Sequence, residues 1–195
     1  MAKLDLDERL NRIEEKISEK SFRENKGLGN EVGYYIFDYS PREEIYVRNH
    51  ISYVKERINN GNKGFKIIEF DLFHLMIQVL QEEGYLEAFY ELEKENGFFD
   101  MADNLVETLG LDEINDLNLI IGKIVQEDLT DSIVFLTGVG KCHPIIASHN
   151  ILNNLHQVLD SVPVVLFYPG EYSGQELKLF GTLDSHNYYR AFRLV

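Results

Sequence analysis

The sequence predicts an α/β fold: a single three-layer domain over residues 1–195 with a mostly parallel sheet. Stretches with helical spacing of apolar residues alternate along the chain with short strand-like stretches. Residues 162–168 are apolar throughout apart from Pro163, which is typical of a parallel strand buried on both faces. Because no internal repeat or linker interrupts this alternation, we expect one domain.

The first predicted element is an amphipathic N-terminal helix over residues 4–17. Four apolar residues recur in it at helical spacing: Leu6, Leu10, Ile13 and Ile17. Residues 34–39 then read as a buried strand between turn-forming residues. A helix should follow, with Ser40 as its cap and Pro41 at its first position, and it should end around residues 59–62.

A second strand is predicted over residues 65–73, with Glu69 and Asp71 toward its carboxyl end. Helices should occupy most of residues 75–126, with interruptions at Gly84, around Gly97 and at Gly110. The sequence therefore predicts a helical insertion, residues 69–128, between the second and third strands.

The remaining elements complete the sheet. We expect a third strand over residues 132–137, a helix over 144–159, a fourth strand over 162–168, a loop over 170–174, a short strand or helical turn over 176–180, and a closing strand over 188–195.

Charge is distributed unevenly along the chain. The formal net charge is −14, and residues 69–128 alone hold 16 acidic and only 2 basic side chains, Lys94 and Lys123. This segment repels nucleic acid, whose binding depends on lysine and arginine replacing phosphate counterions, so we expect no direct DNA binding. Its glutamates are either a solvated helix face or a contact surface for a basic partner.

Several classes of protein are disfavoured. Cys142 is the only cysteine, so neither an internal disulfide nor a cysteine-rich zinc site is possible, which fits a reducing compartment. No apolar signal region follows Met1, and no run approaches the ~18 apolar residues of a membrane span. We therefore expect a cytoplasmic protein without membrane contact.

Phosphate and metal motifs are incomplete. Gly138, Gly140 and Lys141 follow a strand, as in a phosphate-binding loop, but Phe135 replaces the first glycine and Cys142 the Ser/Thr. A tight turn accounts better for this segment. His143, His149 and His156 lack the i, i+4 spacing of helical metal ligands, so we expect no metal and no cofactor.

Two further sets of residues were considered for catalysis. Cys142 adjoins His143, yet consecutive side chains diverge, so this pair is a poor nucleophile and base. Asp38, Glu69 and Asp71 lie where parallel strands end, the place where open α/β sheets bind ligands. Each could equally cap the helix that follows, so no catalytic residue is assigned.

The C-terminal part of the chain carries a resemblance to a known family. The run VLFYPGEYSGQ at 165–175, followed by LFG at 179–181 and YYRAFRL at 188–194, resembles the signature of the BrxB family. Weaker similarity extends to LDERL at 6–10, YIFDY at 35–39, and the stretch from Gly138 to Leu155. Members of this family are small proteins of BREX (bacteriophage exclusion) defence systems.

The resemblance implies a role beside an adenine methyltransferase, an AAA-type ATPase and the phosphatase-like protein PglZ, in a system that methylates host DNA and excludes phage. It implies no established catalytic residues. We therefore expect a non-catalytic adaptor that binds other BREX proteins, PglZ first among them. The alternative is a degenerate nucleotide- or nucleic-acid-binding α/β domain.

Exposed tyrosine and arginine dominate interface energetics, which suggests candidates for partner contact in the signature. They are Tyr168, Pro169, Gly170, Tyr172, Tyr188, Tyr189, Arg190 and Arg193. A structural role in the core or in a turn is the competing interpretation for each of them.

Overall fold

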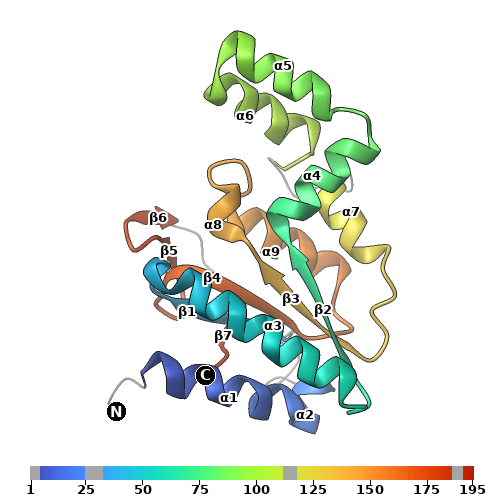
Figure 1. Ribbon diagram of the computed structural model, residues 1–195, viewed down its shortest axis with the longest axis vertical. Helices are drawn as coiled ribbons and strands as arrows, with labels where there is room; N and C mark the ends of the chain where they lie inside the picture. The colour runs from blue at the N-terminus through green and yellow to red at the C-terminus, as the bar shows by residue number, and fades with distance from the viewer. Residues whose placement is uncertain (1–4, 25–32, 112–117, 186–190) are drawn as a thin grey trace. The chain divides into compact units, whose positions relative to one another are not determined.

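The computed structural model describes residues 5–24, 33–111, 118–185 and 191–195. It confirms an α/β protein with a mostly parallel sheet (Figure 1). The chain divides into two compact units. The first consists of Met1–Glu69, Leu129–Thr137 and Asp160–Val195, and the second of Phe70–Asp128 and Gly138–Leu159. The single domain expected from the sequence stays a prediction.

Within the described residues the sheet has seven strands, in the order β2-β3-β4-β1-β7, with β5 beside β4 and β6 beside β5. Their bounds are β1 (Tyr34–Tyr39), β2 (Lys66–Asp71), β3 (Ser132–Thr137), β4 (Val164–Tyr172), β5 (Leu177–Leu179), β6 (Leu183–Ser185) and β7 (Phe192–Arg193). Strands β1 and β3 run parallel to β4, and β7 runs parallel to β1. The pairs β4–β5 and β5–β6 are antiparallel.

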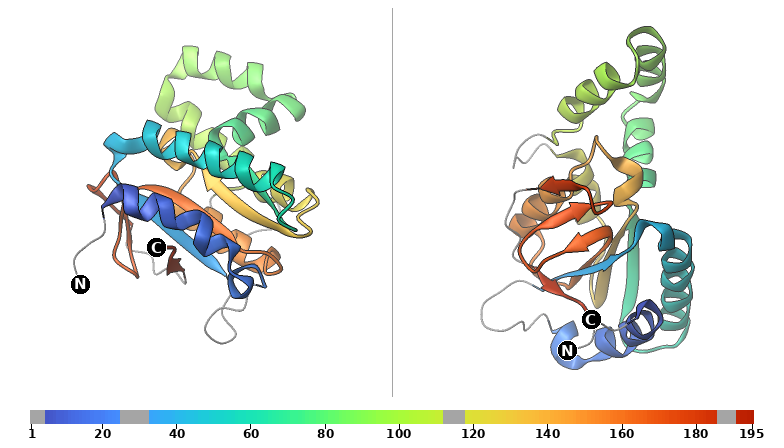
Figure 2. Two further views of the ribbon diagram at one scale, coloured as in Figure 1. Left: turned by 60° about the horizontal axis from the view of Figure 1, so that its bottom comes forward. Right: turned by 90° about the vertical axis from the view of Figure 1, so that its left-hand side faces the viewer.

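The helices of the first unit are α1 (Leu6–Ser18), α2 (Lys20–Arg23) and α3 (Glu44–Asn60), with the 3-10 turn η1 (Pro41–Glu43) before α3. The predicted N-terminal amphipathic helix is confirmed, and Asp5 caps it by accepting a hydrogen bond from the Glu8 amide at 2.8 Å. The α1 and α3 helices cover one face of the sheet (Figure 2).

A hydrophobic core lies between these two helices and the sheet. It joins apolar residues of α1 and α3 to alternate residues of the strands, among them Phe37, Phe135 and Phe167, which are at most 1% exposed. The Phe167 ring lies 5.6 Å from the Phe37 ring and 5.0 Å from the Phe135 ring, measured between centroids. These aromatic contacts hold the central strands together and so position the residues at their carboxyl ends.

The second unit is helical in the residues described. It comprises α4 (Leu72–Glu82), α5 (Leu86–Asn96), α6 (Phe98–Thr108), α7 (Leu119–Val125), α8 (Val139–Cys142) and α9 (Ser148–Val158). The predicted helical insertion, with its interruptions at Gly84, Gly97 and Gly110, is confirmed.

Two predicted boundaries are wrong because neighbouring groups end the elements differently. Strand β2 ends at Asp71 rather than residue 73, because the Asp71 carboxylate accepts from the amides of Phe73 and His74 and so starts α4. The helix expected from residue 144 begins at Ser148. Proline disfavours helical geometry in the residue before it, and His143 has φ −68° and ψ 136°, so α8 stops at Cys142.

The loop expected over residues 170–174 is also largely strand. After its parallel pairing with β1 ends at Pro169, β4 continues through Gly170 to Tyr172 and pairs with β5. A Cβ atom on Gly170 would lie 2.1 Å from the Lys178 carbonyl oxygen, so only glycine permits this approach.

Ser40 does not cap through its side chain. Its carbonyl oxygen accepts from the Glu43 amide at 2.9 Å, which forms the 3-10 turn, and α3 proper begins at Glu44. The predicted position of Pro41, at the start of this turn, is confirmed.

Candidate functional site at the carboxyl ends of the central strands

Asp38 lies at the carboxyl end of β1, in the middle of the sheet of the first unit. Its neighbour in the paired strand β4 is Tyr168. After β1 the chain passes through η1 and α3 to β2, whereas after β4 it turns back into β5, which pairs with β4. Ligands of open α/β sheets bind outside the carboxyl ends of the strands, which is where Asp38 lies.

Two arginines from opposite ends of the sequence meet at this carboxylate. Arg9 of α1 donates from Nη2 to Asp38 Oδ1 at 2.8 Å and from Nη1 to the Asp38 carbonyl oxygen at 2.8 Å. Arg193 of β7 donates to the same Oδ1 and to the Tyr172 carbonyl oxygen. The second carboxylate oxygen accepts from the Tyr172 amide at 3.1 Å. We call Arg9, Asp38, Tyr172 and Arg193 the Asp38 node.

Asp38 and Arg9 are buried away from water, and the negative charge of Asp38 is balanced by the two arginines. Asp38 is 6% and Arg9 7% exposed. Burial opposes ionisation of Asp38, but the hydrogen bonds from Arg193 and the Tyr172 amide, with the charges of Arg193 and Arg9, hold its pKa below the usual range. The Arg9 guanidinium also lies 4.5 Å from the centre of the Phe37 ring. The carboxylate is therefore ionised and fully occupied.

A cleft of about 620 Å³ opens beside the node. Its lining includes Arg9, Asp38 and Tyr39, the start of η1 with Arg42, and Phe180. The Tyr39 hydroxyl donates to Glu44 Oε2 at 2.5 Å, and burial raises the pKa of this phenol. Arg42 is exposed and makes no ion pair with any residue within the described ranges.

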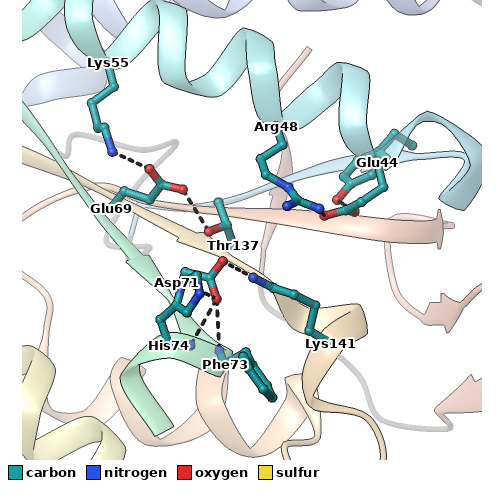
Figure 3. Close-up of polar contacts among 10 residues, drawn as sticks. Glu44, Arg48, Lys55, Glu69, Asp71, Phe73, His74, Thr137 and Lys141 are labelled. Carbon is teal, nitrogen blue, oxygen red and sulfur yellow. Dashed lines mark hydrogen bonds and ion pairs between the residues drawn. The ribbon is translucent and has the colours of Figure 1, made fainter. Parts of the chain in front are cut away.

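Glu69 occupies the corresponding position in β2 and is likewise engaged. Lys55 of α3 donates to its Oε2 at 2.5 Å, and the Thr137 hydroxyl donates to its Oε1 at 3.0 Å (Figure 3). All three residues belong to the first unit. Because each of its oxygens accepts a hydrogen bond from one of these donors, the Glu69 carboxylate is not free to act as a general base.

The turn at Gly138 in the second unit is filled by a protein carboxylate. Lys141 donates to Asp71 Oδ2, and His74 Nδ1 lies 3.6 Å from Asp71 Oδ1 (Figure 3). A Cβ atom on Gly138, which has φ +78°, would lie 2.6 Å from Asp71 Oδ1. The Asp71 carboxylate thus lies against the turn and pairs with its lysine, in agreement with the tight turn predicted.

The pKa values of Asp71 and Cys142 are shifted in opposite directions from their ordinary values. Burial raises the pKa of Asp71, but hydrogen bonds and charge from Lys141, with the His74 amide, outweigh it and lower the pKa overall. Burial, assisted by the Asp71 charge, raises the pKa of Cys142 to about 12. Since the thiolate is the nucleophile, Cys142 is poorly suited to covalent catalysis.

The predicted interface residues fall into three groups. Tyr168 and Tyr172 are 2% exposed, and Pro169 and Gly170 are buried within β4. Arg193 is part of the Asp38 node, yet 41% of its side chain is exposed. Tyr188, Tyr189 and Arg190 lie outside the described residues. Partner contact by this set stays a prediction.

Sequence reasoning found the three carboxylates but missed their partners, Arg9, Lys55 and Lys141. Arg9 did leave a signal, because it lies on the apolar stripe of the N-terminal helix between Leu6 and Ile13. A charge on a core-facing stripe requires a buried counterion. Nothing in the sequence identifies that counterion as Asp38, 29 residues away.

Within the described ranges no group of three or more His, Cys, Asp or Glu side chains is arranged to hold a metal ion. In the same ranges no helix is both long and apolar enough to cross a membrane.

Fold and site together define an open α/β-sheet protein whose strand-end carboxylates are paired with its own basic side chains. Comparison with known proteins identifies the family. The model of the family described as BREX protein BrxB matches residues 68–194. The chain is 49% identical to BREX protein BrxB of Bacillus cereus (strain H3081.97) over 190 residues, 97% of each chain.

A second relative, BREX protein BrxB of Escherichia coli O9:H4 (strain HS), is 35% identical over 190 residues, 97% of this chain and 92% of the relative. The chain therefore belongs to the BrxB family, which places it among the proteins of BREX phage-defence systems. No solved structure matches it.

Proposed function

We propose that this protein is a non-catalytic adaptor of a BREX complex. It acts in the cytoplasm by binding other BREX proteins, with the PglZ-like phosphatase-fold protein as the first partner to test and the methyltransferase and AAA-type ATPase as further ones. Through these contacts it supports host DNA methylation and phage exclusion.

The observation that carries this proposal is that the Asp38 carboxylate is already hydrogen-bonded to other groups of the protein. A general acid or base must reach a substrate proton, and a nucleophile must reach the reacting atom. Both oxygens of Asp38 instead accept hydrogen bonds from Arg9, Arg193 and the Tyr172 amide. The position where an α/β enzyme would hold its chemistry is here used to join parts of the protein.

Co-purification from cells that carry the intact system tests the adaptor. We expect the tagged protein to retain at least one BREX partner through size exclusion, with a fixed stoichiometry by native mass measurement. A protein that elutes as an unbound monomer from such cells would contradict the proposal. Cells that express the tagged protein without the rest of the system provide the background.

The predicted C-terminal contact can be examined in the same assay. Replacement of Tyr189 and Arg190 by serine should reduce partner recovery. The control is the pair Tyr53→Ser and Arg12→Ser, which removes the same two residue types from exposed positions in α3 and α1. Equal recovery with both pairs would remove the C-terminal segment from the contact surface.

A second candidate function is favoured by the cleft beside the Asp38 node. It lies at the carboxyl ends of β1 and β4, and Arg42 on its wall is unpaired within the described residues, so a nucleotide phosphate would meet a cation there. Calorimetry with ATP, GTP and their diphosphates tests this regulatory role. Heat from the wild type that is lost in Arg42→Ala would favour it over a purely architectural cleft.

A further inference from the structure

Helices α5 and α6 of the second unit form an antiparallel hairpin joined at Gly97 (Figure 1). We call Leu86–Asn96, Gly97 and Phe98–Thr108 the acidic hairpin. Gly97 has φ +87°, which allows the chain to reverse within one residue. In the described part of α6, Met101, Ala102 and Leu105 are buried, whereas α5 has no buried residue.

Large aromatic side chains are left in solvent on this hairpin. Phe99 is 76% exposed, Tyr90 47% and Phe98 40%. The rings of Phe98 and Phe99 meet edge to face at the hairpin turn, with 5.6 Å between centroids. Exposed aromatic residues gathered in one supersecondary unit are typical of a contact surface, because each carries a large area of apolar surface at small entropic cost.

The same hairpin is strongly acidic. It has seven acidic side chains, all exposed: Glu87, Glu91, Glu93, Glu95, Asp100, Asp103 and Glu107. Its one basic residue, Lys94, is paired with Glu91. Protein interfaces combine apolar anchors with charged side chains, and here the charged side chains, which we call the rim, are nearly all of one sign.

The sign of the rim selects the class of occupant. Nucleic acid is repelled because it needs cationic groups to displace its counterions. A second copy of the hairpin would oppose acid to acid, and an anionic bilayer surface attracts basic rather than acidic segments. A protein surface with basic side chains around an apolar pocket satisfies both the charge and the exposed rings.

We propose that the acidic hairpin docks onto a basic surface of another BREX protein, with Phe99 entering an apolar pocket. This inference rests on the adaptor function and assigns to it a surface separate from the C-terminal candidates. The glutamates accelerate and orient the encounter, and Phe98 and Phe99 slow dissociation once the complex has formed.

Two matched pairs of variants test the two parts of this surface. Glu87→Lys, Glu93→Lys and Glu95→Lys together bring the formal charge of the hairpin from −6 to zero. Glu15→Lys, Glu56→Lys and Glu127→Lys make the same charge change at exposed positions outside the hairpin. Phe99→Ser removes the most exposed ring, and Ile45→Ser, at a site 71% exposed, removes apolar surface from α3.

Association and dissociation are measured by surface plasmon resonance against the BREX protein recovered with the wild type. The hairpin triple variant should lower the association rate at least tenfold at low salt, and Phe99→Ser should raise the dissociation rate at least tenfold. The control variants should change neither rate more than twofold. Circular dichroism melts of all four verify that they fold.

The outcomes separate this inference from the adaptor function. If the wild type recovers a BREX protein and the hairpin variants bind it as the wild type does, the docking surface is wrong while the adaptor stands. If the control triple variant loses binding equally, only net charge matters and the surface is again wrong. Binding of the wild type to duplex DNA or phosphatidylglycerol vesicles, lost in Phe99→Ser, would overturn the choice of partner. If the wild type recovers no BREX protein, the adaptor function is wrong, and the docking surface that rests on it is wrong as well.

Discussion

Asp38 and Glu93 carry the same charge in opposite surroundings. Asp38 is 6% exposed and accepts hydrogen bonds from two arginines and a backbone amide. Glu93 is exposed on α5 and has no ion pair with any described residue. At the Asp38 node of the first unit, charge is buried and joins α1, β1, β4 and β7. In the acidic hairpin, charge is left to solvent, where it contributes little to folding and much to the surface potential.

The largest expected effect lies at the Asp38 node. Asp38→Ala should lower the free energy of unfolding by about 3–5 kcal/mol, because it leaves the Arg9 guanidinium buried without a counterion. Urea unfolding at neutral pH measures the loss, with Glu93→Ala as the exposed control, expected within about 0.5 kcal/mol of wild type.

The joint replacement Arg9→Met with Asp38→Leu should be more stable than Asp38→Ala alone, because apolar pairs often replace buried ion pairs without loss. A loss below about 1 kcal/mol for Asp38→Ala would mean that the node is hydrated in solution, and the contrast between the two regions would fail.

A smaller effect is expected at Gly170, where β4 and β5 meet. Gly170→Ala should destabilise the protein by about 1–3 kcal/mol, since the added methyl group would overlap the Lys178 carbonyl oxygen and force the strands apart. The control is Gly122→Ala in α7, where a Cβ meets nothing within 4 Å and alanine should stabilise the helix. Equal thermal melting of Gly170→Ala and wild type would contradict the close approach.

The dependence of stability on acidic pH also distinguishes the buried Asp38 from the exposed glutamates of the hairpin. The pKa of Asp38 is lower in the folded protein than its ordinary value of 3.8, so its stabilisation is complete above pH 3.8 and is lost as the pH falls through the folded-state pKa. In Asp38→Asn this part of the acid-induced loss should disappear. Denaturant titrations between pH 2 and 6 measure it, because the free energy of unfolding changes with pH wherever the folded and unfolded states bind different numbers of protons. Identical slopes of the free energy of unfolding against pH for wild type and Asp38→Asn would contradict the assignment.

The smallest effect on stability is expected from the hairpin. The triple variant Glu87→Lys, Glu93→Lys and Glu95→Lys should change the free energy of unfolding by less than about 1 kcal/mol, because these side chains are exposed and none makes an ion pair with a described residue. Urea unfolding beside wild type measures the change. A large loss would show that these glutamates stabilise the fold, and the hairpin would then resemble the first unit.

Local patterns predicted the elements well. The strands over residues 34–39 and 132–137 have the predicted bounds, because each is a short, mostly apolar run of strand-forming residues that ends in a turn. The end of β4 could not be predicted in this way. Its continuation past Pro169 depends on β5 arriving as an antiparallel neighbour, and that pairing is a tertiary event that the residues of β4 do not encode.

The candidate site was predictable only in the part that depends on local sequence. The rule for open α/β sheets led to Asp38, Glu69 and Asp71 from their places at strand ends. It did not lead to their partners, since Arg193 lies 155 residues from Asp38 and Lys141 lies 70 from Asp71. Long-range ion pairs have no periodicity in sequence, so only the folded chain brings them together.

Strand β1 acquires its neighbours late during synthesis. It is made early, yet β4 follows more than a hundred residues later, and β7 with Arg193 later still. Until then the nascent chain carries a hydrophobic strand with unpaired edges and an Asp38 that lacks one of its arginines. Non-local pairing of this kind folds slowly and exposes strand edges to aggregation. Expression should therefore depend on chaperones that shield β1 on the ribosome, a demand set by the order of the chain rather than by its final stability.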